Sequence, residues 1–136
     1  MEFESYVRGH LDGVLQICIE EGWKSYLADH ERTHRALTAP GVTTIVAIEN
    51  GEICGFAQVQ SDGEIQAHLS VLAVREAFRR QGIGKKLIAK SFQKAGGTRI
   101  DLITDGAQDF YQSMTHSAKL GFRLYSDAEP SDGSVP

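Results

Sequence analysis

The stretch from residue 67 to residue 97 constrains the fold most, because it joins an apolar run, a basic glycine-rich turn and a helical pattern. Residues 67–74 are an apolar run of strand type, and residues 79–86 read Arg-Arg-Gln-Gly-Ile-Gly-Lys-Lys. Helical spacing follows, with apolar residues at Ile83, Leu87, Ile88, Phe92 and Ala95. Two glycines at 96–97 are typical of a helix end. The stretch therefore predicts a strand that enters a helix through a short turn.

The start of this helix carries a concentration of positive charge, from Arg79, Arg80, Lys85 and Lys86. Cations are unfavourable there, because the helix dipole already places partial positive charge at the N-terminus. An anion bound to the free backbone N–H groups would make these charges complementary. Gly82 and Gly84 would let a phosphate approach the main chain. We therefore predict a phosphate-bearing ligand at the turn, whereas a solvated basic helix face would leave the charges unexplained.

Two common phosphate-binding motifs do not fit the turn. A P-loop needs glycine where Arg79 stands, and Lys86 replaces the Ser or Thr that would hold magnesium. A dinucleotide-binding fingerprint needs a third glycine where Leu87 stands. What remains is the pattern Arg79-x-x-Gly82-x-Gly84 after a strand.

This pattern resembles the acetyl-CoA-binding signature of the GNAT superfamily of acyltransferases, and residues 72–74 and 120–122 (Leu-Ala-Val and Leu-Gly-Phe) strengthen the resemblance. The resemblance implies that amides of the turn hold the CoA pyrophosphate and that the preceding strand pairs with the pantetheine arm. The residues it implies in cofactor binding are Leu72, Ala73, Val74, Arg79, Arg80, Gln81, Gly82, Ile83, Gly84 and Lys85.

The rest of the pattern predicts an α+β fold with a mixed sheet. Helices are expected at 11–21, 29–37, 83–95 and 107–119, with Trp23 and Tyr26 in a linking segment. Strands are expected at 42–49, 53–60, 64–74, 99–103 and 121–125. Asn50-Gly51 and Asp62-Gly63 are turn signals between the first three strands. The sheet is thus an antiparallel meander followed by one strand–helix–strand crossover.

We expect one GNAT-like domain at residues 1–125 and a polar, frayed tail at residues 126–136. The family usually has a seventh strand after the Gly-Phe strand, and few residues remain here to form it. That strand is missing, very short or supplied by a partner chain. Because an exposed sheet edge invites pairing, a homodimer is expected.

Composition bounds the class of protein. Hydrophobic residues make up 41% of the 136-residue chain and charged residues 24%, which is typical of a globular domain. No apolar stretch has the length of a membrane span, and the acidic start of the chain is unlike a signal peptide. Cys18 and Cys54 lie in apolar surroundings, which favours reduced, buried thiols in a cytoplasmic protein. A net charge of −4 with one local basic cluster argues against a nucleic-acid binder and fits an anionic cofactor with a cationic second substrate.

Acetyl transfer from a thioester to an amine needs a neutral amine, a donor to the oxyanion and a proton for the leaving thiolate. The resemblance implies that Leu72 supplies the backbone N–H donor and that a tyrosine on the last helix is the general acid. Residues 107–111 fit the family pattern and make Tyr111 that acid, whose phenol can donate at neutral pH.

Counting back from the Gly-Phe motif instead places Ser117 at the tyrosine position. An insertion of about six residues after Tyr111 reconciles the two counts. If Tyr111 only packs the helix on the sheet, the acid is Ser117, His116 or water.

His68 is the candidate base or water relay, because it lies on the central strand with Glu64 and Gln66 and has a suitable ordinary pKa. A structural histidine is the alternative. Glu20, Glu21 and Trp23 follow the first helix, where the family shapes its acceptor site. They could attract and cover a cationic amine, or they could form a solvated helix end with a packing Trp.

Residues 30–34 read His-Glu-Arg-Thr-His, which matches the H-E-x-x-H zinc motif. The flanks are charged, the extended motif fails at Leu37 and Pro40, and no downstream helix offers a third ligand. We therefore predict no metal site.

The sequence predicts an acetyl-CoA-dependent N-acyltransferase that acts on a primary amine of a small molecule or peptide by direct attack in a ternary complex. A non-catalytic acyl-CoA-binding or sensor domain with the same fold is the alternative, because fold does not settle activity. The identity of the amine stays open.

Overall fold

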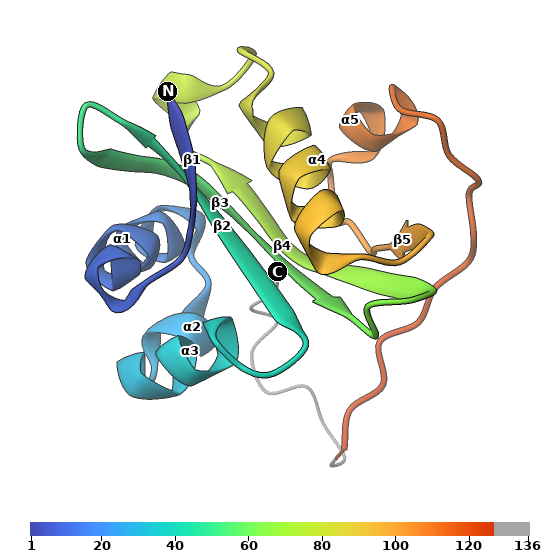
Figure 1. The fold of residues 1–136 in the computed structure, drawn as a ribbon, viewed down its shortest axis with the longest axis horizontal. Helices are drawn as coiled ribbons and strands as arrows, with labels where there is room; N and C mark the ends of the chain where they lie inside the picture. Colours follow the sequence, from blue (N-terminus) through green and yellow to red (C-terminus); the bar gives the residue numbers. More distant parts are fainter. Residues whose placement is uncertain (127–136) are drawn as a thin grey trace.

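The computed structural model describes residues 1–126, which form one mixed sheet with helices on both faces (Figure 1). The strands lie in the order β1 to β5, and their bounds are Glu2–Ser5, Val42–Glu49, Glu52–Ser61, Gln66–Val74 and Arg99–Asp101. β1 to β4 pair antiparallel, and β5 pairs parallel with β4. The predicted α+β class, with a meander followed by one crossover, is confirmed.

Helices cover the two faces unequally. The α-helices α1 to α5 span Leu11–Glu21, Lys24–Leu27, His30–Leu37, Ile83–Ala95 and Gln108–Gln112. Two short 3-10 helices, η1 and η2, span Arg8–His10 and Glu76–Phe78. One apolar cluster joins α1 and the end of α3 to one face of the sheet, and a second joins α4 to the other face. The crossover helix α4 covers this second face, with the short α5 beside it (Figure 1).

Local sequence signals account for most of the boundaries. Asn50 and Gly51 both have positive φ, as a two-residue hairpin turn requires. Gly22 ends α1 in the left-handed conformation, and the Asp29 side chain accepts from the Arg32 N–H to cap α3. α4 begins and ends at the predicted residues.

Two predictions for the C-terminal part are wrong. The helix expected at 107–119 ends at Gln112, where Ser113 and His116 donate side-chain hydrogen bonds to nearby carbonyls instead of continuing the helix ladder. Residues 121–125 form no strand, and Phe122 and Leu124 are 76% and 89% exposed. A strand forms only beside a partner, and no strand of the described chain lies beside this one. The tail predicted at residues 126–136 lies, apart from its first residue, outside the described residues.

Two further elements were not expected. β1 pairs along β2 through residues 2–5, and α2 forms in the segment predicted as a linker. Both are too short for sequence periodicity to reveal.

A bulge in β4 changes which side chains face α4. Leu69 pairs with Val59 and Val71 with Gln58, so Ser70 is left without a partner in the ladder. Before the bulge Leu69 packs in the α4 cluster, and after it Leu72 does so while Val71 packs on the α1 side. Simple alternation would have placed residues 68 and 72 on one face, but the bulge separates them.

The α4 interface contains one unsatisfied polar atom within the described chain. Ser91 is fully buried, and its Oγ has no hydrogen-bond partner. Burying an unpaired hydroxyl costs about 1 kcal/mol or more. We expect Ser91→Ala to raise the free energy of unfolding by about 1 kcal/mol in a urea titration.

Thr44→Val is the matched control for this prediction, because the buried Thr44 Oγ1 donates to the Leu37 carbonyl at 2.8 Å. Losing that satisfied bond should lower stability. A lower stability for Ser91→Ala would mean that its hydroxyl has a partner in solution.

Candidate active site

The site lies where β4 loses its parallel neighbour. β5 pairs with β4 only from Gln66 to His68, so residues 69–74 of β4 have no strand on that side within residues 1–126. A pocket of about 660 Å³ lies beside the end of β4. Its lining residues come from α1, β4, the β4–α4 turn, α4 and α5, and are Glu21, Leu72, Ala73, Val74, Phe78, Arg79, Arg80, Gly82, Ile83, Gly84, Lys85, Ala107, Phe110, Tyr111 and Ser113.

The N-terminus of α4 forms one wall of this pocket. Gly82 caps the helix in the left-handed conformation at φ 79°, and no side chain caps the first turn. Arg80 also has a positive φ, of 64°, which is uncommon for a residue with a side chain. The first N–H groups of an α-helix have no acceptor within the helix. This wall therefore offers backbone donors to an anion.

The charges at the pocket favour an anionic ligand. Arg79, Arg80 and Lys85 line it, and Glu21 is the only carboxylate among the described lining residues. The Arg79 guanidinium pairs with Oε1 of Glu21 at 2.9 Å, and its Nε donates to the Val74 carbonyl at 2.8 Å. Arg79 is thus held across the turn, whereas Arg80 and Lys85 line the pocket with no carboxylate partner among residues 1–126.

α5 supplies the opposite wall. The rings of Phe110 and Tyr111 meet edge to face, with centroids 4.9 Å apart. Phe110 covers Gly84 so closely that a Cβ added at Gly84 would lie 3.1 Å from its ring. Burial raises the pKa of Tyr111, so its phenol stays protonated at neutral pH and can donate a hydrogen bond or a proton.

The structure brings together most of the residues implied in cofactor binding. All of them except Gln81 line the pocket, and so does Tyr111. His68 does not: it is exposed and lines a separate groove of about 560 Å³ beside Asp101. The bulge at Ser70 accounts for this, because it turns residue 68 away from the face that carries Leu72.

The three residues predicted to bind the amine substrate do not lie together in the structure. Glu21 lines the pocket, whereas the Glu20 carboxylate pairs with Arg75 and with Gln16. Trp23 is half-buried and packs against Tyr26 in the cluster below α1, with ring centroids 6.2 Å apart.

Other reactive groups of the chain are occupied in structural contacts. In the H-E-x-x-H segment, His34 Nδ1 lies 2.8 Å from the Tyr6 hydroxyl, and both oxygens of Glu31 accept from Arg8. Residues 1–126 contain no group of three or more His, Cys, Asp or Glu side chains arranged to hold a metal. Cys18 and Cys54 are buried free thiols, and burial raises the pKa of Cys18 to about 12, as expected for an unreactive thiol.

The sequence analysis did not predict that two aromatic residues, Phe78 and Phe110, line the pocket. Phe110 directly precedes Tyr111 within the 107–111 pattern, and that position was one signal. Phe78 directly precedes the basic turn, and that position was the available signal.

Comparison with known proteins identifies the family. A model of the GNAT acetyltransferase domain matches residues 40–114, which include β2 to β5, the turn, α4 and α5. The chain belongs to the GNAT acetyltransferase family. A search of the curated proteins found no match.

Solved structures of this GNAT fold align over nearly the whole chain. An aminoglycoside acetyltransferase from an uncultured soil metagenomic sample, in complex with sisomicin, is 22% identical and has a TM-score of 0.72, covering 94% of this chain and 96% of that one. An aminoglycoside N-acetyltransferase in complex with CoA is 20% identical, with a TM-score of 0.70 and coverages of 93% and 99%. A transcriptional regulator from Bacillus halodurans is 18% identical, with a TM-score of 0.75 and coverages of 91% and 98%. These likenesses establish the fold.

None of the helices within residues 1–126 combines the length and the apolar character that crossing a membrane requires.

Proposed function

We propose that this GNAT domain transfers the acetyl group of acetyl-CoA to a primary amine by direct attack in a ternary complex. The observation that carries the proposal is the pocket beside β4, where the strand end, the glycine turn and Tyr111 lie together. The solved relative in complex with CoA supports the choice of cofactor.

The pocket fits the two ends of acetyl-CoA differently. Its basic end, formed by the uncapped start of α4 with Arg80 and Lys85, suits the phosphates. Its apolar end, with Leu72, Val74 and Phe110, suits the pantetheine arm. Acetyl-CoA supplies an acetyl group already activated as a thioester.

Two groups of the chain then take part in the transfer. The backbone N–H at Leu72 donates to the oxygen on which negative charge develops during attack. The Tyr111 phenol donates a proton toward the leaving sulfur. We assign no base role to His68, because it lines the other groove. The acceptor ammonium loses one proton to water before it attacks the thioester carbon. As the C–N bond forms and the C–S bond breaks, the nitrogen loses a second proton to water, and the Tyr111 phenolate regains a proton from water.

For the acceptor, we propose a cationic amine that approaches Glu21. Within residues 1–126, Arg79 pairs with Oε1 of this carboxylate, which leaves Oε2 for the amine. Because the solved relatives include aminoglycoside acetyltransferases, amino sugars with a primary amine are the first acceptor class to test. A homodimer that pairs along the sheet edge stays a prediction.

The function is tested by thioester consumption with acetyl-CoA across a panel of amino sugars, polyamines, amino acids and peptides. Calorimetric titration with CoA runs beside it. We expect CoA binding and turnover with at least one cationic amine. Binding without turnover across the panel would favour the non-catalytic sensor, and no binding would contradict the assignment of the turn.

Gly84→Glu should abolish CoA binding in the calorimeter. Its side chain would displace Phe110, whose ring lies 3.1 Å from the position of the new Cβ, and would place a negative charge at the phosphate end. Gly9→Glu is the matched control, since Gly9 has open space around its Cβ position and lines a different pocket. Unchanged affinity in Gly84→Glu would show that CoA does not bind here.

Tyr111→Phe should leave the Kd for CoA unchanged and lower kcat by about a hundredfold, because the phenol is removed while the ring still packs. The raised pKa of Tyr111 means that its contribution persists at neutral pH and is lost only as pH rises through that pKa.

Tyr26→Phe is the control for this variant. Burial raises the pKa of Tyr26 to about 12, and the residue lies outside the pocket. An unchanged kcat in Tyr111→Phe would transfer the acid role to Ser117, His116 or water.

A further inference from the structure

Arg75 lies at the point where the chain leaves β4 for the cofactor turn. It directly follows the last strand residue and is the N-cap of η2, with an extended backbone conformation. Its backbone N–H donates to the Cys54 carbonyl of β3 at 2.8 Å, and its own carbonyl accepts from the Phe78 N–H at 2.8 Å. The direction of the turn therefore depends on this residue.

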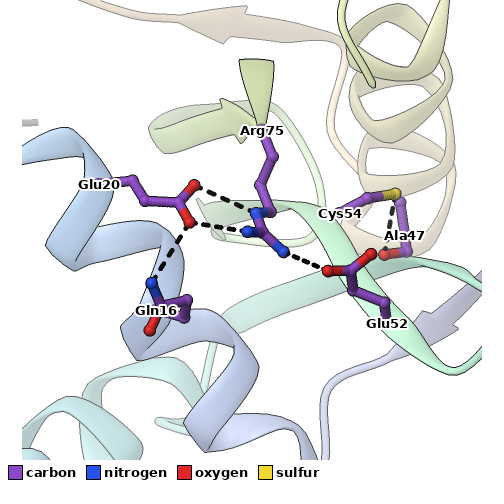
Figure 2. Close-up of polar contacts among 6 residues, drawn as sticks. All are labelled: Gln16, Glu20, Ala47, Glu52, Cys54 and Arg75. Carbon is purple, nitrogen blue, oxygen red and sulfur yellow. Dashed lines mark hydrogen bonds and ion pairs between the residues drawn. The ribbon is translucent and has the colours of Figure 1, made fainter. Parts of the chain in front are cut away.

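The Arg75 side chain joins two other elements to this point (Figure 2). Its Nε and one terminal nitrogen donate to the two oxygens of Glu20, at 3.1 and 2.8 Å. The other terminal nitrogen donates to Glu52 at 2.6 Å. Glu20 lies in the last turn of α1 and Glu52 begins β3, so one guanidinium connects α1, β3 and the exit from β4.

A second ion pair also joins α1 to the turn. Glu21, the residue after Glu20, pairs with Arg79 at the far end of η2. Consecutive carboxylates of α1 thus hold two arginines of the turn, four residues apart. The hydrogen bond from Arg75 also lowers the pKa of Glu20, which keeps this carboxylate charged through the neutral range.

The turn needs such outside support. Between β4 and α4 it contains only the three-residue η2, and then two left-handed residues, Arg80 and Gly82. The N–H groups at the start of α4 must be held in place before an anion arrives, because ordering them on binding would cost affinity.

Arg75 does not touch the ligand pocket itself. Its neighbours Val74 and Arg79 line that pocket, whereas Arg75 lines a different one, between α1 and the β2–β3 turn. Two carboxylates already compensate its charge. It can therefore act on the cofactor only through the turn.

We propose that Arg75 is a positioning residue for CoA binding, which with Glu20 and Glu52 holds the phosphate-binding turn on α1 and β3. This inference rests on the proposed function, because it takes the ligand of the turn to be CoA.

The direction in which one substitution changes the affinity for CoA tests this proposal. Glu20→Gln removes a negative charge near the phosphate end, so electrostatics alone would tighten CoA binding. Positioning gives the opposite result, because Arg75 loses its bidentate partner. We expect the Kd for CoA to rise about fivefold in Glu20→Gln, in Arg75→Gln and in their double variant alike. Arg75→Lys, which keeps the charge without the planar fork, should recover only part of the affinity.

Arg8→Gln is the matched control. Arg8 also makes a bidentate pair, with Glu31 at 2.8 and 2.9 Å, but this pair lies between η1 and α3 and outside the CoA pocket. Titrations are run well below the unfolding temperature of each variant, so that lost stability alone does not change the Kd. Arg8→Gln should then bind CoA like the wild type.

Each outcome decides one question. No CoA binding by the wild type would overturn the proposed function, and with it this inference. Wild-type binding with unchanged or tighter binding in Glu20→Gln would overturn the positioning role alone. If the changes in CoA binding free energy caused by Glu20→Gln and Arg75→Gln add in the double variant, the two residues act independently. That result would also overturn the positioning role.

Discussion

The site depends on the early end of the parallel pairing between β4 and β5. Parallel strands in a sheet normally bury both faces and leave no space between them. Here three residue pairs join the strands, and beyond them β4 continues to Val74 paired only with β3 within residues 1–126. The unpaired side of β4, the start of α4 and the short α5 then surround one pocket. Continued parallel pairing would have closed the space that the pocket occupies.

The basic residues of the turn divide into two groups. Arg75 and Arg79 pair with carboxylates of α1 and β3, so part of the positive charge stabilises the protein itself. Arg80 and Lys85 face the pocket from the same short segment. This division explains how a chain with a net charge of −4 keeps a basic site. Its acidic residues include those that hold the turn.

Sequence reasoning worked where the evidence was local. The glycine turn, the bounds of α4 and the Asn50-Gly51 hairpin follow from backbone preferences and apolar spacing within a few residues. The residues implied in cofactor binding lie together because one strand, one turn and one helix contain nearly all of them. It was wrong for residues 113–119, predicted as the end of a helix, and for residues 121–125, predicted as a strand, because the apolar alternation there forms a strand only beside a neighbour.

The sequence by itself determined the α+β class, the family resemblance and the basic, glycine-rich character of the turn, since each follows from contiguous residues. Only the tertiary structure decided which side chains share the pocket. The bulge at Ser70 turned His68 away from it, and Arg75 drew Glu20 out of reach of an acceptor. Both results come from contacts between residues distant in sequence, such as Glu20 and Arg75, or from a one-residue change of register. No local sequence pattern predicts the orientation of His68 or the pairing of Glu20 with Arg75, because both depend on how the sheet and α1 pack together.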